Sequence, residues 1–149
     1  MFQKILAASD LSEVSISALR MAIQLGEEQG AQVVCLYVTE KAPEKGSWSS
    51  EFFEDALNDI NAAVEQQNEA AFERLRQQIA TVCGVQFDAL ELLIRPGRPA
   101  ETIVRVAGDV GADLIVVGTH GRRGVLGSVA EAVVRNSQQP VLVLPAKTG

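Results

Sequence analysis

The sequence is poor in cysteine and histidine, which narrows the chemistry it can support. Its 149 residues include two cysteines and a single histidine, His120. Cys35 and Cys83 form no CxxC pair and have no companion histidine at metal-ligand spacing, which argues against a zinc site. We therefore expect both cysteines to be structural thiols rather than redox groups. The sequence specifies no nucleophile or orienting acid for His120, so it does not indicate a catalytic histidine.

Long apolar runs are also absent. No stretch approaches the roughly 20 apolar residues that a membrane-spanning helix needs, so membrane insertion is not expected. Residues 1–9 lack the basic region and the long apolar segment of a secretory signal, and Asp10 interrupts the apolar run that they begin. These features favour a cytoplasmic location.

Basic residues are fewer than acidic ones. Lysine and arginine number 13 against 19 aspartates and glutamates, which gives a formal net charge of -6. A surface of this average charge repels the phosphate backbones of nucleic acids. Nucleic acid is therefore not an expected partner.

The chain alternates apolar runs with amphipathic segments, over a length that suits one domain, residues 1–149. Runs rich in β-branched residues predict strands at residues 3–9, 32–38, 86–94, 113–117 and 140–144. Helical periodicity predicts a helix in each gap, the second within residues 51–83 and the fourth with a stripe of Val129, Val133 and Val134. Strands such as LIVVG are apolar at every position, as expected for parallel strands covered on both faces. The predicted fold is α/β, with a doubly wound, five-stranded parallel sheet.

Helix-terminal residues support this order of elements. Ser12 is a suitable N-cap for the first helix, and Pro99 suits the first position of the third. Gly30, Gly84 and Gly111 stand where a helix ends in a left-handed C-cap.

The ends of the first and fourth strands are the first place to look for a binding site. In an open α/β sheet a ligand binds beyond the carboxyl ends of the strands, where the strand order reverses. The residues at these two strand ends are Ala8, Ser9, Asp10, Val117, Gly118 and Thr119.

A glycine-rich stretch, GTHGRRGVLGS, occupies residues 118–128 and leads into the fourth predicted helix. Glycines let backbone amides approach an anion, and a helix N-terminus supplies unpaired N–H groups. The stretch is therefore a candidate phosphate site, although turns that require glycine would give the same pattern. Ser128 and Glu131 also have the spacing of a capping box, so Ser128 has a structural role available to it.

Three segments carry a family resemblance: KILAASDLSEVSISALRMAIQLG, GRPAETIVRVA, and DLIVVGTHGRRG with the following GSVAEAVVRNSQQPVLVL. Together they resemble the universal stress protein family over nearly the whole chain. The resemblance implies a strand order of 3-2-1-4-5 in a Rossmann-like fold of the adenine nucleotide hydrolase-like type.

The resemblance also implies a nucleotide site. In nucleotide-binding members, the aspartate that ends the first strand contacts adenine, and a valine that ends the second lines the base pocket. A G-x2-G-x9-G-[ST] loop holds ribose and phosphates. The corresponding positions in this sequence are Asp10, Val38, Gly118, Gly121, Gly127 and Ser128, with Val129 beside them.

The loop departs from the family pattern. Its spacing is G-x2-G-x5-G-S, so four residues are missing and about 6 Å of reach is lost at about 1.5 Å per residue. The contacts of the loop with the β- and γ-phosphates are the ones that this shortening affects most. Arg122 and Arg123 can compensate with charge-assisted bonds to phosphate, or they form a solvated basic loop. Ala8 stands where many binders carry proline. The complete set of candidate site residues is Ala8, Ser9, Asp10, Val38, Val117, Gly118, Thr119, His120, Gly121, Arg122, Gly127, Ser128 and Val129.

Three functions fit these features. The first is a stress-response regulatory protein that binds ATP or another adenine nucleotide and thereby alters its association with an unidentified protein partner. The second is a nucleotide-independent dimeric interaction module, which the shortened loop favours. The third is a slow ATP hydrolase, for which no catalytic residue can be named. Mg²⁺ is a candidate companion of the phosphates, but no second carboxylate adjoins Asp10 to hold it.

The last predicted strand, which begins at Pro140 and ends at Leu144, is a candidate dimer interface. In the implied strand order it lies at a sheet edge, and it has no lysine or internal proline to deter pairing. A second copy related by a two-fold axis would cover its backbone groups and apolar faces. The second helix or the C-terminal residues are alternative covers, and the homodimer is the expected state.

Overall fold

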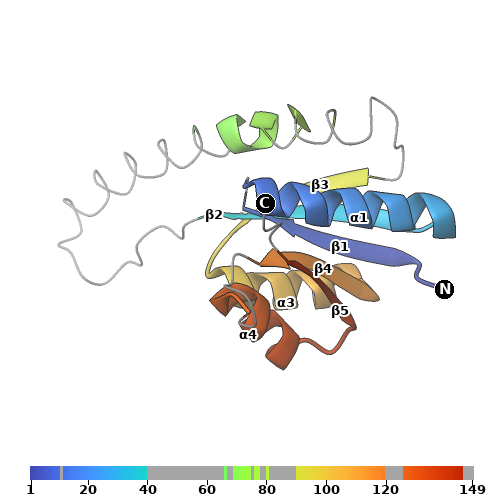
Figure 1. Cartoon of the computed structure of the whole chain (residues 1–149). Coiled ribbons are helices and arrows are strands. Elements are labelled where there is room, and N and C mark those ends of the chain that lie inside the picture. The colour runs from blue at the N-terminus through green and yellow to red at the C-terminus, as the bar shows by residue number, and fades with distance from the viewer. Residues whose placement is uncertain are drawn as a thin grey trace.

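A five-stranded parallel sheet forms the centre of the computed structural model, which describes residues 1–10, 12–39, 66, 69–74, 76–77, 80, 90–119 and 126–145. The strand order is β3-β2-β1-β4-β5, and every neighbouring pair is parallel (Figure 1). This order confirms the predicted α/β doubly wound fold. The strands are β1 (Lys4–Ser9), β2 (Gln32–Thr39), β3 (Leu90–Pro96), β4 (Leu114–Thr119) and β5 (Val141–Pro145).

Strands β2 to β5 end one or two residues later than predicted. The reason is that strand pairing continues through their last residues: Thr39 pairs with Pro96, and Thr119 pairs with Pro145. Residues 86–89, which were also predicted as strand, lie outside the described residues. As a result, residues such as Thr119 belong to the paired strands and lie at the carboxyl edge of the sheet.

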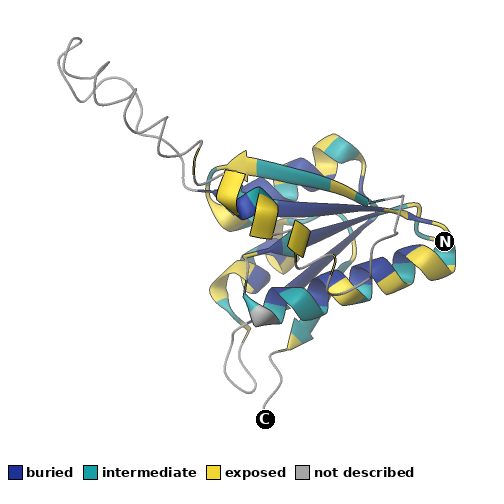
Figure 2. Cartoon of the chain, turned by 90° about the horizontal axis from the view of Figure 1, so that it is seen from above, coloured by how far each residue is buried: buried dark blue, intermediate teal, exposed yellow. Residues whose placement is uncertain are grey.

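Helices cover both faces of the sheet (Figure 1). Helix α1 (Glu13–Gln29) lies on one face, whereas α3 (Pro99–Val110) and α4 (Ser128–Asn136) lie on the other. Ile5 of β1 packs with Leu19 of α1, and the next residue, Leu6, packs with Ile103 and Val133. The central strands are therefore buried on both faces, as the dark blue sheet in Figure 2 shows.

Most of the predicted helix ends are confirmed. Ser12 is the N-cap of α1, and its side chain accepts a backbone hydrogen bond. Pro99 is the first residue of α3. Gly30 and Gly111 end α1 and α3 in the left-handed conformation, with φ of 65° and 74°. Gly84 lies outside the described residues.

The predicted apolar stripe of α4 is partly wrong. Val133 is buried, but Val129 and Val134 are 40% and 46% exposed, and Ala130 is the second buried residue of this helix. The helix has nine residues and packs against β4, α3 and the edge strand β5. Because the sheet ends at β5, it covers only a narrow side of α4.

Strand β5 lies at the sheet edge, as predicted, and is apolar on both faces. Leu142 and Leu144 pack towards α1, while Val141 and Val143 pack towards α3 and α4. All four side chains are only half-buried. Among the described residues, β4 is the only strand that pairs with β5.

The described cysteine is a structural thiol. Cys35 in β2 is buried, and this burial raises the pKa of its thiol to about 12. The thiol therefore stays protonated near neutral pH, whereas the thiolate is the reactive form. Cys83 lies outside the described residues.

The second predicted helix falls mostly outside the described residues. Those described within it, residues 66, 69–74, 76–77 and 80, are helical. Across the described part of the chain, no helix combines the length and apolar character needed to cross a bilayer.

Candidate functional site

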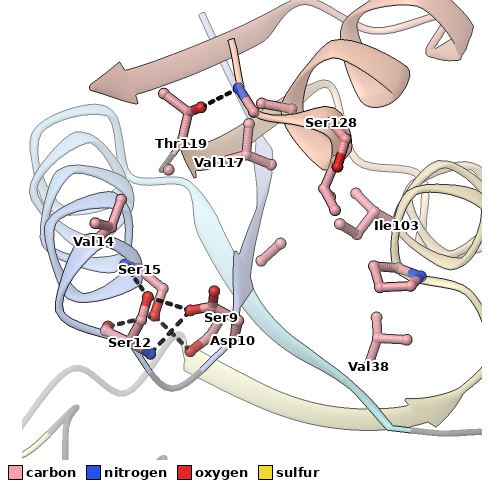
Figure 3. Close-up of a pocket in the computed structure, with 16 residues that line it drawn as sticks. Ser9, Asp10, Ser12, Val14, Ser15, Val38, Ile103, Val117, Thr119 and Ser128 are labelled. Carbon is pink, nitrogen blue, oxygen red and sulfur yellow. Dashed lines mark hydrogen bonds between the residues drawn. The ribbon is translucent and has the colours of Figure 1, made fainter. Parts of the chain in front are cut away.

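The candidate site is a pocket at the carboxyl edge of the sheet, where β1 and β4 lie side by side. The chain leaves β1 for α1 on one face and enters α4 after β4 on the other. This divergence is the switch point at which open α/β sheets leave a binding crevice. The pocket has a volume of about 330 Å³ (Figure 3).

The structure brings most of the predicted site residues together in this pocket. Its lining includes Ala8, Ser9, Asp10, Val38, Val117, Gly118, Thr119, Gly127, Ser128 and Val129. The predicted residues His120, Gly121 and Arg122 lie outside the described residues, as does Arg123.

The interior of the pocket is apolar. Val38 comes from β2, Ile103 from α3 and Val117 from β4, so three separate elements supply the apolar wall. Ile103 and Val117 are each only 3% exposed, and both belong to the core cluster beneath α3 and α4. The floor is thus held rigid by the core. Figure 3 shows Val38 and Ile103 on one side of the pocket and Asp10 and Ser12 on the other.

The carboxylate of Asp10 is oriented by the start of α1. Its Oδ1 accepts a hydrogen bond from the backbone N–H of Ser12 at 2.9 Å and another from the Ser12 hydroxyl. The same Ser12 Oγ accepts the N–H of Ser15 at 3.4 Å and so caps the helix. One short turn therefore sets both the helix start and the direction of an exposed acidic group.

Two buried serines connect β1 to α1 behind this turn. The Ser15 hydroxyl donates to the backbone carbonyl of Ser12 at 2.8 Å, and the hydroxyls of Ser9 and Ser15 lie 3.1 Å apart. This network fixes the end of β1, and with it the position of Asp10.

The opposite end of the pocket is formed by the start of α4. Gly127 is the N-cap, and its N–H donates to Thr119 Oγ1 at 2.6 Å. Ser128 is already helical, so the predicted capping box of Ser128 with Glu131 is wrong, and the carboxylate of Glu131 pairs with Arg135. Because glycine has no side chain, the N-cap residue itself makes no side-chain hydrogen bond to the backbone N–H groups of the first turn. These groups and the helix dipole favour an anion beside them.

Gly118 allows β4 to approach α1 closely at the pocket wall. A Cβ atom at this position would lie 2.6 Å from Val14 Cγ1 and 2.9 Å from the Val14 carbonyl oxygen. Both separations are shorter than packed atoms tolerate, and the carbonyl belongs to a helix backbone that cannot rotate away. A side chain is therefore excluded at residue 118.

The described lining offers four kinds of contact: apolar surface, backbone amides, serine and threonine hydroxyls, and one carboxylate. Asp10 is the only Asp, Glu, His, Lys or Arg among the described lining residues. The described residues contain no group of three or more His, Cys, Asp or Glu side chains arranged to hold a metal ion.

Several lining residues were not predicted from the sequence: Ser12, Val14, Ser15, Pro99, Ile103 and Ala130. Pro99 and Ile103 were missed because α3 follows β3, which is not a switch-point strand. A signal was present, since Pro99 marks a helix that begins directly beyond the carboxyl end of a parallel strand, at the same edge as the site.

Comparisons with known proteins identify the family. The pattern that describes the Universal stress protein family matches residues 1–145. Universal stress protein MJ0531 of Methanocaldococcus jannaschii is 34% identical, over 97% of this chain and 82% of that protein. The solved structure of hypothetical protein MJ0577 is 27% identical with a TM-score of 0.73, covering 100% and 99% of the two chains. A universal stress protein solved in complex with cAMP is 21% identical with a TM-score of 0.73, covering 98% of each chain. The chain described here belongs to the universal stress protein family.

Proposed function

We propose that the pocket binds an adenine nucleotide and that the protein is a stress-response regulator whose association with a partner depends on nucleotide occupancy. The observation that carries the proposal is the arrangement of the described lining. Apolar walls, the Asp10 carboxylate and the uncapped first turn of α4 surround one pocket of about 330 Å³. An adenine nucleotide needs the same contacts for its ring, its exocyclic amine and its phosphate.

The acidic side of the pocket suits the exocyclic amine of adenine. Adenine would lie against Val38 and Ile103, with its exocyclic amine towards Asp10. That amine donates hydrogen bonds, and a carboxylate only accepts them.

The first phosphate would lie at the start of α4. Gly127 and Ser128 line the pocket there, and the backbone N–H groups of this turn have no side-chain cap. A bound Mg²⁺ would be held mainly by phosphate oxygens, since Asp10 is a single carboxylate and magnesium commonly combines few carboxylates with substrate phosphates.

A protein of the same fold supports the class of ligand. The universal stress protein with a TM-score of 0.73 to this chain was solved in complex with cAMP. At 21% identity the likeness is one of fold, and it supports the proposal to that extent.

We expect ATP and ADP to bind within about tenfold of each other, a difference of about 1.4 kcal/mol. The reason is the shortened glycine loop, which leaves little backbone to wrap the γ-phosphate. Isothermal titration with ATP, ADP and AMP measures this ratio. Failure of all three to bind would overturn the proposed function, whereas a much larger preference for ATP would show that Arg122, Arg123 or another segment completes the phosphate site.

A dimeric interaction module that works without nucleotide is the second candidate, favoured by β5. This edge strand is apolar on both faces, and its side chains from Val141 to Leu144 stay half-buried. An open edge of this kind readily pairs with another strand. A second copy pairing through β5 is compatible with the regulator as well, so dimerisation alone does not separate the two candidates.

The chain is expected to be a homodimer with and without nucleotide, and Val143→Lys is expected to make it monomeric. A lysine in β5 would place a charge in the apolar contact and deter edge pairing. Sedimentation equilibrium at micromolar concentration measures the mass, and circular dichroism checks that the variant is folded. A monomeric wild type, or a dimer that survives in a folded Val143→Lys variant, would contradict the proposed interface.

A further inference from the structure

A second hollow lies beside the pocket, in a groove between α3 and α4 that runs from their N-terminal ends to Arg105 and Asn136. Its volume is about 710 Å³, and it shares Pro99, Ser128 and Val129 with the pocket. Val129 is 40% exposed, so the apolar ridge between the two spaces is open to solvent rather than sealed. A ligand that fills the pocket can therefore extend into the groove without displacing the core.

The α3 wall of the groove carries two arginines in a chain whose net charge is negative. Arg98 is the N-cap residue of α3, and Arg105 lies further along the same helix. Arg98 meets Glu101 at 4.0 Å, with the two side chains 86% and 76% exposed. An ion pair so long and exposed is weak. Two guanidinium groups thus stand against one carboxylate on this wall, which favours an anion.

We propose that the polyphosphate tail of a bound adenine nucleotide leaves the pocket over Ser128 and Val129 and enters this groove, where Arg98 and Arg105 bind its outer phosphates. This inference rests on the proposed nucleotide site. The first phosphate lies at the start of α4, and Ser128 and Val129 continue from that turn into the groove. Guanidinium groups bind phosphate through charge-assisted, often bidentate, hydrogen bonds. The groove therefore supplies positive charges that can bind the phosphate tail, and these charges do not depend on the shortened glycine loop.

The double variant Arg98→Ala/Arg105→Ala tests the proposal by comparing ligands with and without a tail. The charge-matched control is Arg20→Ala/Arg74→Ala, because both of these arginines are exposed and neither lines the pocket or the groove. Isothermal titration at low ionic strength gives the affinities of adenosine, cAMP, ADP and ATP for the wild type and both variants. Adenosine and cAMP have no tail and report on the pocket alone.

In the groove variant, the affinity for ATP is expected to fall by about fivefold, since exposed arginine–phosphate contacts are modest. The affinities for adenosine and cAMP should change by less than about twofold. In the control variant, the affinity for every ligand should also change by less than about twofold. Raising the ionic strength should reduce the difference in ATP affinity between the wild type and the groove variant. Unchanged ATP affinity, or an equal loss for adenosine, would overturn the proposal. If the affinity for ATP fell only in an Arg122→Ala variant, the tail would lie in the glycine loop, and the groove proposal would be overturned. A wild type that binds none of the ligands would overturn the proposed function itself.

Discussion

Replacing Gly118 with alanine is expected to destabilise the protein by about 1–3 kcal/mol, which is the usual cost of forcing an extra methyl group into a packed contact. The added Cβ would lie 2.6 Å from Val14 Cγ1 and 2.9 Å from the Val14 carbonyl oxygen. The side chain can turn aside, but the carbonyl can move only if α1 shifts away from β4. Denaturant unfolding of the two proteins measures the difference in the free energy of unfolding.

Gly108→Ala is the matched control for this substitution. Gly108 lies within α3, and a Cβ there would meet nothing within 4 Å. Alanine is expected to stabilise this helix by up to about 1 kcal/mol, because glycine is the poorer helix former. If Gly118→Ala were as stable as the wild type, the close approach of β4 and α1 at the pocket wall would be wrong.

The largest expected effect on binding comes from Asp10→Ala, which should lower the affinity for AMP and for ATP by about tenfold or more. A hydrogen bond to a charged group contributes about 1.5–3 kcal/mol, and about 1.4 kcal/mol corresponds to tenfold in affinity. Isothermal titration with AMP and ATP measures both affinities.

Two controls separate recognition from folding at Asp10. Asp109→Ala removes an exposed carboxylate of α3 that does not line the pocket, so it matches the change in charge. Asp10→Asn keeps one oxygen to accept the Ser12 N–H, and it should preserve the turn while losing affinity. Affinity equal to the wild type in a folded Asp10→Ala variant would rule out the adenine contact.

The arrangement of the sheet could be predicted because its signals are local. Strands such as Leu114–Thr119 are apolar on both faces, which indicates burial between helices, and Ser12 and Pro99 mark helix starts through their own backbone chemistry. The strand order followed from the family resemblance. The ends of the strands were less accessible, since β4 continues through Thr119 only because β5 pairs with it.

The errors at α4 have physical causes that lie outside the local sequence. Ser128 has the spacing of a capping box, but Gly127 takes the extended cap conformation, with φ −63° and ψ 157°, and accepts the N–H of Glu131. Val129 and Val134 have helical spacing with Val133, but a helix above an edge strand buries little of its surface. The contribution of Ile103 to the pocket also depends on packing, because α3 is far in sequence from β1 and β2, which end beside Asp10 and Val38.

The most direct test of the nucleotide site is to titrate AMP into isotope-labelled protein and follow the backbone amide signals by NMR. The proposed site predicts saturable shifts concentrated at pocket residues, among them Asp10, Val38, Gly118 and Ser128, with little change in the amides of β5. No shifts at saturating AMP, or shifts confined to residues that do not line the pocket, would contradict the account.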